Sequence, residues 1–291
     1  MIVVRLKGGM GNQLFQYAFG KRIAAQLGTE VQFDLSALLD RSKKDMVFRN
    51  YDLDIFNVNP TFLQDADYLN FIYKLKSSSV GRWQRRRAEK GKTYIKETQF
   101  HVMPELLTSP PDDALYDGWW QSERYFEQVG EVLRNDLQFV DALLLESQQL
   151  NDQIQTTNAI CLNVRRTDFL KTPDLNTTNL DYFLKGARYI AERVESPHFF
   201  VFSDDMDWCE TNIRLEQPTT YVSHTHKGRK FGNYLRLMSQ CDHFIIPNSS
   251  FAWWAVWLSG GKDKMVVAPK HWFANSVYDT SDLVKASWVR L

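Results

Sequence analysis

Hydrophobic residues at the start of the chain follow two periods in succession. An apolar run at residues 2–6 predicts a buried strand, and a glycine-rich turn follows at residues 8–12. Apolar residues then recur at every fourth position, which is the spacing of one helix face: Phe15, Phe19, Ile23 and Leu27. The first part of the chain is therefore expected to be a strand, a tight turn and a helix.

The ends of this helix carry residues that suit helix termini. Asn12 is a good N-cap and Gly28 a good C-terminal stop. A second strand is expected at residues 31–34. A strand, helix and strand in this order begin a parallel α/β sheet.

The middle of the chain is less regular. Residues 40–120 are rich in Asp, Asn, Pro and Ser, and we expect irregular insertions and short helices there. Residues 121–157 are expected to be helical, with one apolar face near Tyr125 and Leu133 and a second helix from Val140 to about Gln155.

Strands and helices alternate regularly from residue 159 onward. Strands are expected at 159–164, 199–203, 220–223, 241–247 and 265–268, and helices near 180–194, 205–213, 229–239 and 249–259. This alternation predicts a doubly wound parallel sheet. The whole chain is interpreted as two Rossmann-like domains, residues 1–155 and 156–291, with a ligand cleft expected between them.

Charge and cysteine usage narrow the class of protein. The formal net charge is zero, so attraction to nucleic acid is not expected. The three cysteines show no disulfide or zinc spacing, and no apolar run is long enough for a membrane span or a signal peptide. A cytoplasmic protein is expected. The basic segment at residues 82–87 is interpreted as solvated, with peripheral contact at the inner membrane face as the alternative.

Aromatic residues make up 14% of the chain. Large buried cores would use them, and so would a groove in which sugar rings stack on aromatic side chains. Composition leaves both interpretations open.

A pair of arginines follows the strand expected at residues 159–164. Arg165 and Arg166 would lie at the carboxyl end of a parallel strand, where ligands of open α/β sheets bind. Guanidinium groups bind phosphate oxygens at two points, and Asp168 is placed to orient one of them. The alternative is a pair of surface arginines with a local salt bridge.

A second polar segment lies between a strand and an aromatic helix. Asn248, Ser249, Ser250 and Phe251 lead into the apolar stretch at residues 252–258. The N-terminus of a buried helix offers free backbone N–H groups and the positive end of the helix dipole to an anion. Together with the arginines, this segment predicts a diphosphate site that needs no metal. Ordinary capping by Asn248 or Ser249 is the alternative.

Two further segments are candidates for nucleotide contacts. Asp204 and Asp205 follow the strand at 199–203, and the Asp-x-Asp spacing of residues 205–207 is a weak indication of a metal site. Gly9 and Gly11, with Asp34 after the next strand, resemble a dinucleotide-binding fingerprint. That fingerprint fails at Leu14, where its third glycine would fall, so an NAD-type oxidoreductase is kept only as a rival.

These segments, in this order, resemble the α-1,2-fucosyltransferases of glycosyltransferase family 11. Residues 8–18 are similar to the N-terminal signature of that family, and Asn163–Asp168 resembles the His-x-Arg-Arg-x-Asp motif of several fucosyltransferase families. Residues 202–205 and 248–254 are similar to two later motifs. Asn163 replaces the usual His and cannot titrate near neutral pH, so no general-base role is supported there.

The resemblance implies a GT-B fold and an inverting transfer of L-fucose from GDP-β-L-fucose, without a metal cofactor. The implied acceptor is the 2-hydroxyl of a terminal β-galactose in an oligosaccharide or glycolipid. Arg165, Asn12 and Asp168 are the candidate catalytic residues, and the catalytic base is left open. The candidate donor-binding residues are Gly9, Gly11, Asn163, Arg165, Arg166, Asp204, Asn248, Ser249, Ser250 and Phe251. A carbohydrate-binding protein without catalytic activity is the third hypothesis.

Overall fold

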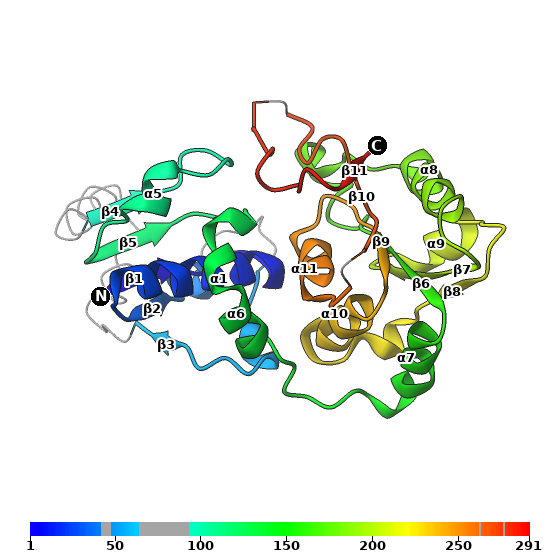
Figure 1. The fold of residues 1–291 in the computed structure, drawn as a ribbon, viewed down its shortest axis with the longest axis horizontal. Coiled ribbons are helices and arrows are strands. Elements are labelled where there is room, and N and C mark those ends of the chain that lie inside the picture. Colours follow the sequence, from blue (N-terminus) through cyan, green and yellow to red (C-terminus); the bar gives the residue numbers. More distant parts are fainter. Residues whose placement is uncertain (42–47, 64–92, 262, 276) are drawn as a thin grey trace. The chain divides into compact units, whose positions relative to one another are not determined.

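The chain forms two compact units, Met1–Gln138 and Phe139–Leu291 (Figure 1). The structure is a computed structural model that describes residues 1–41, 48–63, 93–261, 263–275 and 277–291. The division precedes the boundary expected after residue 155, because helix α7 (Gln148–Gln155) belongs to the second unit. The helix buries Leu150 and Ile154, and it contacts strand β6 (Asn158–Val164) of that unit.

The first unit is built on a parallel sheet of five strands in the order β3-β2-β1-β5-β4. The strands are β1 (Ile2–Arg5), β2 (Val31–Asp34), β3 (Thr61–Phe62), β4 (Thr93–Lys96) and β5 (Ala114–Asp117). The long helix α1 (Met10–Leu27) packs on β1 and β2 and ends at Gly28, which is left-handed as expected of a helix stop. The shorter helices among the described residues of this unit are α2 (Ser36–Leu39), α5 (Pro104–Thr108) and α6 (Gly130–Asp136).

Aromatic side chains fill the core of the first unit. Phe19 on α1 stacks on Trp120 with ring centroids 4.2 Å apart, and it meets Tyr125 edge to face. In the second unit Trp253 and Trp254 are fully buried. Most of the aromatic surplus is therefore core, which supports the simpler of the two interpretations of the composition.

The second unit contains a parallel sheet of six strands in the order β11-β10-β9-β6-β7-β8. The strands besides β6 are β7 (Pro197–Ser203), β8 (Thr219–Tyr221), β9 (His243–Ile245), β10 (Val266–Ala268) and β11 (Val289–Arg290). The helices besides α7 are α8 (Leu180–Ala191), α9 (Met206–Asn212), α10 (Gly232–Ser239) and α11 (Ser250–Leu258).

Helices cover both faces of this second sheet (Figure 1). Ile160 and Leu162 of β6 join a core cluster with Phe183 of α8. Phe202 of β7 contacts Tyr234 of α10, with ring centroids 5.5 Å apart. Because successive strand residues face opposite sides, these contacts place α8 and α10 on different faces. The doubly wound arrangement expected from the sequence is confirmed.

The region expected to be irregular, residues 40–120, contributes three sheet strands, β3, β4 and β5. β5 lies between β1 and β4, although it is only four residues long. Asp113, immediately before β5, has a φ of 47°, so a tight turn precedes the strand. The polar residues of this turn masked the short apolar pattern of the strand in the sequence.

The helices expected over residues 121–157 are shorter in the structure than predicted, because Gly130 starts a separate helix and residues 140–144 are not helical.

Candidate functional site

Three polar segments meet at the carboxyl edge of the second sheet. In the strand register Val164 at the end of β6 lies beside Ser203 at the end of β7. Leu162 lies beside Ile245, so the segment after β9 runs along the same edge. The sheet therefore brings together the three segments of the second unit that the sequence singled out.

Arg165 is held by a two-point ion pair. Its Nε donates to Asp168 Oδ1 at 2.9 Å and its Nη2 donates to Asp168 Oδ2 at 2.8 Å. Asp204 Oδ2 lies 3.4 Å from the same Nε. Nη1 has no hydrogen-bond partner among the described residues, so two of its N–H groups are left for a ligand. The ion pair expected between Asp168 and Arg165 is present in the structure.

Arg166 points to a different set of neighbours. Its Nε pairs with Asp205 Oδ2 at 3.0 Å, and its guanidinium lies 3.8 Å from the centre of the Trp208 ring. Asp205 also caps α9 through the Trp208 N–H. These contacts fasten the segment after β6 to the start of α9, which is a structural use of Arg166.

Asp204 anchors the loop that carries both arginines. Its carboxylate accepts hydrogen bonds from the backbone N–H groups of Arg166 at 2.9 Å and Thr167 at 3.1 Å, and from the Thr167 hydroxyl. Sequence reasoning did not identify Thr167, since a single Thr in a loop gives no signal. Guanine recognition by Asp204 stays a prediction, and it would have to use the lone pairs that these bonds leave free.

The carboxyl edge of the second sheet carries less positive charge than its two adjacent arginines suggested. The ion pairs bring two arginines together with Asp168, Asp204 and Asp205, which gives a formal net charge of 2 − 3 = −1. A diphosphate would therefore depend on directed N–H groups more than on an excess of positive charge.

The start of α11 supplies such groups. Ser249 occupies the N-cap position, and no side chain caps the helix. The first N–H groups of a helix have no partner within it, so those of Ser250 and Phe251 are available to an anion. Ser250 and Phe251 are partly exposed, while Ser249 is buried.

Two of the predicted site residues serve mainly as scaffold. Asn248 donates its amide N–H groups to the carbonyls of Leu175 at 2.9 Å and Trp272 at 2.8 Å. Its side chain therefore does not cap α11, and its buried Oδ1 has no hydrogen-bond partner within the part of the chain that the structure describes. Asn163 donates to the carbonyl of Phe202 at 3.1 Å and ties β6 to β7.

The glycine-rich turn lies at the corresponding edge of the first unit. Gly8 has a φ of 78°, and a Cβ there would lie 2.4 Å from Asn12 Nδ2, so Gly8 is the residue that must be glycine. Gly9 is the N-cap of α1 and Gly11 lies buried within that helix. Asn12 is also inside the helix, where its Oδ1 accepts a hydrogen bond from Gln121 at 2.6 Å. The expected N-cap role of Asn12 is wrong.

The geometry around Asp34 opposes the dinucleotide interpretation. Asp34 is fully buried and accepts hydrogen bonds from Arg5 Nε at 2.8 Å and from the backbone N–H and hydroxyl of Ser36. A ribose would have to displace this network. Leu14 is also fully buried against the core.

The Asp-x-Asp segment is used within the fold. Asp205 is committed to Arg166 and to the α9 cap, and Asp207 is exposed. Among the described residues, no group of three or more His, Cys, Asp or Glu side chains is arranged to hold a metal ion.

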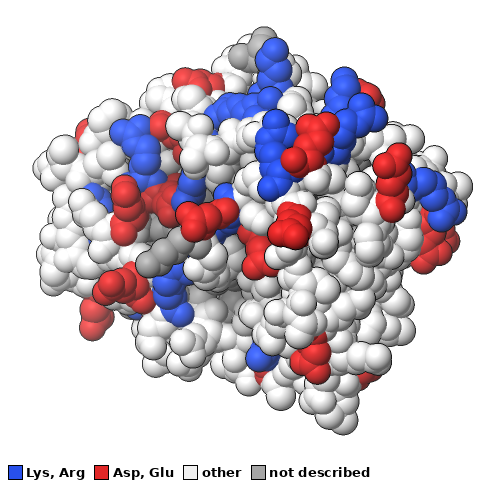
Figure 2. Space-filling model, turned by 45° about the vertical axis from the view of Figure 1, so that its right-hand side comes forward, with Lys and Arg blue, Asp and Glu red and all other residues white. Residues whose placement is uncertain are grey.

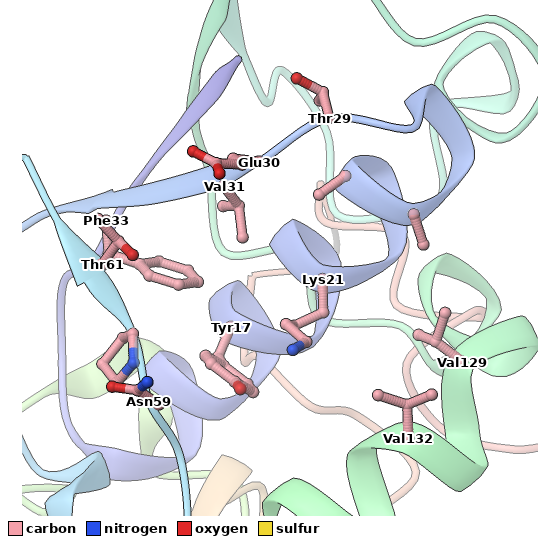
Figure 3. A pocket seen from close by; sticks show the side chains of 13 residues that line it. Tyr17, Lys21, Thr29, Glu30, Val31, Phe33, Asn59, Thr61, Val129 and Val132 are labelled. Carbon is pink, nitrogen blue, oxygen red and sulfur yellow. The ribbon is translucent and has the colours of Figure 1, made fainter.

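Two cavities lie away from the carboxyl edges of the two sheets. One of about 440 Å³ lies in the first unit beside the start of β2, where Lys21 and Tyr17 face it from α1 (Figure 3). Asp136 accepts a hydrogen bond from the Tyr17 hydroxyl at 2.7 Å and pairs with Lys21 at 3.1 Å. The other, of about 550 Å³, lies beside the start of β6. Neither cavity is lined by a predicted site residue.

Charge on the surface is mixed in sign. Figure 2 shows Lys and Arg side chains interspersed with Asp and Glu on one face of the molecule. The basic segment at residues 82–87 lies outside the described residues. Within the part of the chain that the structure describes, no helix is long and apolar enough to cross a membrane.

Comparison with known proteins identifies relatives over the whole chain. A family model described as Glycosyl transferase family 11 matches residues 100–291. An alpha-1,2-colitosyltransferase of Escherichia coli is 29% identical over 306 residues, covering 100% of this chain and 99% of the relative. The O-antigen biosynthesis glycosyltransferase WbnK of Escherichia coli is 29% identical over 317 residues, covering 98% and 99%. Human galactoside alpha-(1,2)-fucosyltransferase 1 is 26% identical over 184 residues, covering 58% and 50%.

Solved structures share the fold. The fucosyltransferase NodZ from Bradyrhizobium superposes with a TM-score of 0.52 at 14% identity, covering 88% of this chain and 92% of NodZ. NodZ alpha-1,6-fucosyltransferase co-crystallised with GDP gives a TM-score of 0.50 at 14% identity, covering 88% and 91%. The two Rossmann-like units are thus of the GT-B type, as the sequence predicted.

Proposed function

The chain belongs to glycosyl transferase family 11, and we propose that it is an inverting α-1,2-fucosyltransferase. It would transfer L-fucose from GDP-β-L-fucose to the 2-hydroxyl of a terminal β-galactose in an oligosaccharide. The similarity to a human galactoside alpha-(1,2)-fucosyltransferase supports the linkage and the acceptor class. The structure of NodZ with GDP supports the nucleotide.

One observation in the second unit carries the donor assignment. Asp168 fixes the Arg165 guanidinium at Nε and Nη2, while Nη1 has no partner among the described residues. The uncapped start of α11 follows the neighbouring strand β9 at the same edge of the sheet. An oriented guanidinium and free helix N–H groups together suit a diphosphate.

The proposed mechanism assigns each group a role as the nucleotide leaves. The bond between C1 of fucose and the β-phosphate oxygen breaks, and its electron pair passes to that oxygen. Arg165 and the N–H groups of Ser250 and Phe251 hydrogen-bond the phosphate as its charge grows. A preorganised donor of this kind stabilises a transition state by about 2.7–4 kcal/mol. We propose that these groups act without a bound metal, and that Ser249 contributes its hydroxyl.

A second donor has a specific observation in its favour. The colitosyltransferase relative matches the full chain at 29% identity, a longer match than that of the human fucosyltransferase. Colitose is L-fucose without its 3-hydroxyl. A site that hydrogen-bonds the 3-hydroxyl would reject colitose strongly, whereas a site that only packs against C3 would accept both sugars. Competition between GDP-fucose and GDP-colitose tests this choice.

The principal test is a transfer assay. The protein is incubated with GDP-fucose and a panel of β-galactosides in the presence of a chelator, and the product linkage is determined by NMR. We expect an α-1,2-linked fucoside and undiminished activity with the chelator. Transfer only from GDP-colitose, or only to a different hydroxyl, would refute the corresponding part of the proposal.

Thermal melting separates the remaining hypotheses. A ligand that binds only the folded state raises Tm by mass action. We expect GDP to raise Tm without magnesium and NAD to have no effect. A shift with NAD alone would support the oxidoreductase, and a shift with lactose but not GDP would support a binding protein.

A further inference from the structure

The turn after β5 is held in an unusual conformation. Trp120 has a φ of 55°, a left-handed conformation that a non-glycine residue keeps only where the surrounding structure enforces it. A Cβ on Gly118 would lie 2.6 Å from Glu97 Cβ and 2.6 Å from the Trp120 ring. The turn is therefore shaped around the Glu97 side chain.

Glu97 follows β4 directly and faces this turn. Its Oε2 accepts the N–H of Trp119 at 2.6 Å, and its Oε1 accepts the N–H of Trp120 at 3.0 Å. The Glu97 N–H donates to the Asp117 carbonyl and extends the pairing of β4 with β5. Each carboxylate oxygen has a further lone pair, so Glu97 can still accept a proton.

The cations near Glu97 are engaged by other acids. Arg5 pairs with Asp34 at 2.8 Å and with Asp117 at 2.7 Å. Lys7 pairs with Asp117 at 2.7 Å. Glu97 makes no ion pair with any described residue, and it is half-buried. A half-buried carboxylate that is not directly paired with a cation is costly to keep ionised.

The surroundings of Glu97 suit a sugar. The Trp119 ring is half-buried beside Gly8, whose Cβ position is 3.0 Å from a ring atom. Lys7 Nζ lies 4.7 Å from the centre of the Trp119 ring. An aromatic ring and an ammonium group thus lie beside the glycine turn, and the Glu97 carboxylate bonds to the backbone of the residue that carries the ring. All three lie at the carboxyl edge of the first sheet, where α/β folds bind their ligands.

We propose that Glu97 is the base that takes the proton from the acceptor hydroxyl, an inference that rests on the proposed function. The hydroxyl O–H bond breaks and its proton passes to a Glu97 oxygen. The hydroxyl oxygen forms the new bond to C1 of the donor sugar. The bond from C1 to the β-phosphate oxygen breaks, and its electrons leave with the nucleotide.

The electrostatics of the turn agree with this role. Burial raises the pKa of Glu97 to about 7, against the opposing effect of the Trp119 and Trp120 N–H groups. Of the charged groups that face it, Lys7 lowers the pKa and Asp117 raises it. A base with a pKa near the working pH is effective in catalysis. The unprotonated form is the active one, so the rate should fall as pH drops below about 7.

The test compares Glu97→Gln with Glu105→Gln, an exposed control on α5 of the same unit. kcat/KM for the galactoside is measured from pH 5.5 to 9, and GDP-dependent melting is recorded for each variant. We expect Glu97→Gln to lose at least about a hundredfold in rate and to lose the acidic limb of the pH profile. Glu105→Gln should match the wild type. If Glu97→Gln melts too early, Glu97→Asp is put through the same measurements.

Azide distinguishes a base from a support for the turn. Azide attacks without losing a proton, so it should restore donor turnover in the Glu97→Gln variant and yield fucosyl azide. A wild-type rate, a retained acidic limb, or a slow variant that azide does not rescue would each overturn the proposal. Absence of transfer by the wild type from any GDP-sugar would instead refute the proposed function.

Discussion

Asp168 holds the Arg165 guanidinium at two points, Nε at 2.9 Å and Nη2 at 2.8 Å, three residues along the chain. The ion pair fixes the direction of the guanidinium just after β6 and leaves its Nη1 N–H groups without a partner among the described residues. The arrangement is suited to a leaving group that gains negative charge only in the transition state, because the donors are already in position when that charge develops.

Removing the Arg165 guanidinium should therefore affect catalysis more than folding. We expect Arg165→Ala to lower kcat by at least about a hundredfold, in line with loss of one preorganised donor. Arg165→Lys should also be impaired, since an ammonium group cannot form the two-point contact. Steady-state kinetics and Tm are measured together, with exposed Arg188→Ala on α8 as the control. Near-normal kcat in Arg165→Ala would remove the phosphate role.

Asp204 should matter for stability as well as activity. Asp204→Ala leaves the backbone N–H groups of Arg166 and Thr167 without their acceptor. We expect the free energy of unfolding to fall by about 1–3 kcal/mol. Urea denaturation measures this change, and Asp207→Asn, an exposed residue on α9, is the control. A stability equal to that of the wild type would mean that the loop is held by other contacts.

The turn after β5 should not tolerate a side chain at residue 118. Gly118→Ala would place a Cβ 2.6 Å from the Glu97 and Trp120 side chains, so we expect a loss of at least about 1–3 kcal/mol from overpacking. The matched control is Gly130→Ala at the start of α6, where an added Cβ would meet no described atom within 4 Å beyond its own helix and chain neighbours, and φ is already helical. This control should be neutral or should raise stability by about 0.4–1 kcal/mol. Equal Tm values for the two variants would contradict the close approach.

Asp117 should make the protein sensitive to acid. Burial alone would raise its pKa, but Arg5 and Lys7 outweigh burial and lower the pKa to about 2. A depressed pKa stabilises the folded state above the ordinary value of 3.8, and this stabilisation is lost as pH falls toward 2. The contribution is on the order of 2 kcal/mol.

The measurement is the free energy of unfolding in urea between pH 2 and pH 5. Asp117→Asn should be less stable than the wild type at pH 5, and the difference should shrink toward pH 2. A constant difference across this range would show that titration of Asp117 is not the cause.

Local patterns in the sequence were enough for most of the second unit, although not for strand β11, and for the start of the first unit. The four-residue period of Phe15, Phe19 and Ile23 predicted α1, and regular alternation after residue 159 predicted strands β6–β10. Both patterns are local, because each arises from the apolar residues on the buried side of a single helix or strand. The strand ends then placed Arg165 and Ser249 on one edge, because parallel strands align their carboxyl ends.

The tertiary structure decided what the side chains of those segments do. No local pattern indicated that Asp204 would bind the loop of Arg166, or that Asn248 would bond with Leu175 and Trp272 instead of capping α11. Glu97 was indistinguishable from other acids until the fold placed β4 beside β5 and paired the nearby Lys7 with Asp117. The hydrogen-bond and ion-pair partners of such side chains come from residues distant in the sequence, and only the folded chain brings those residues together.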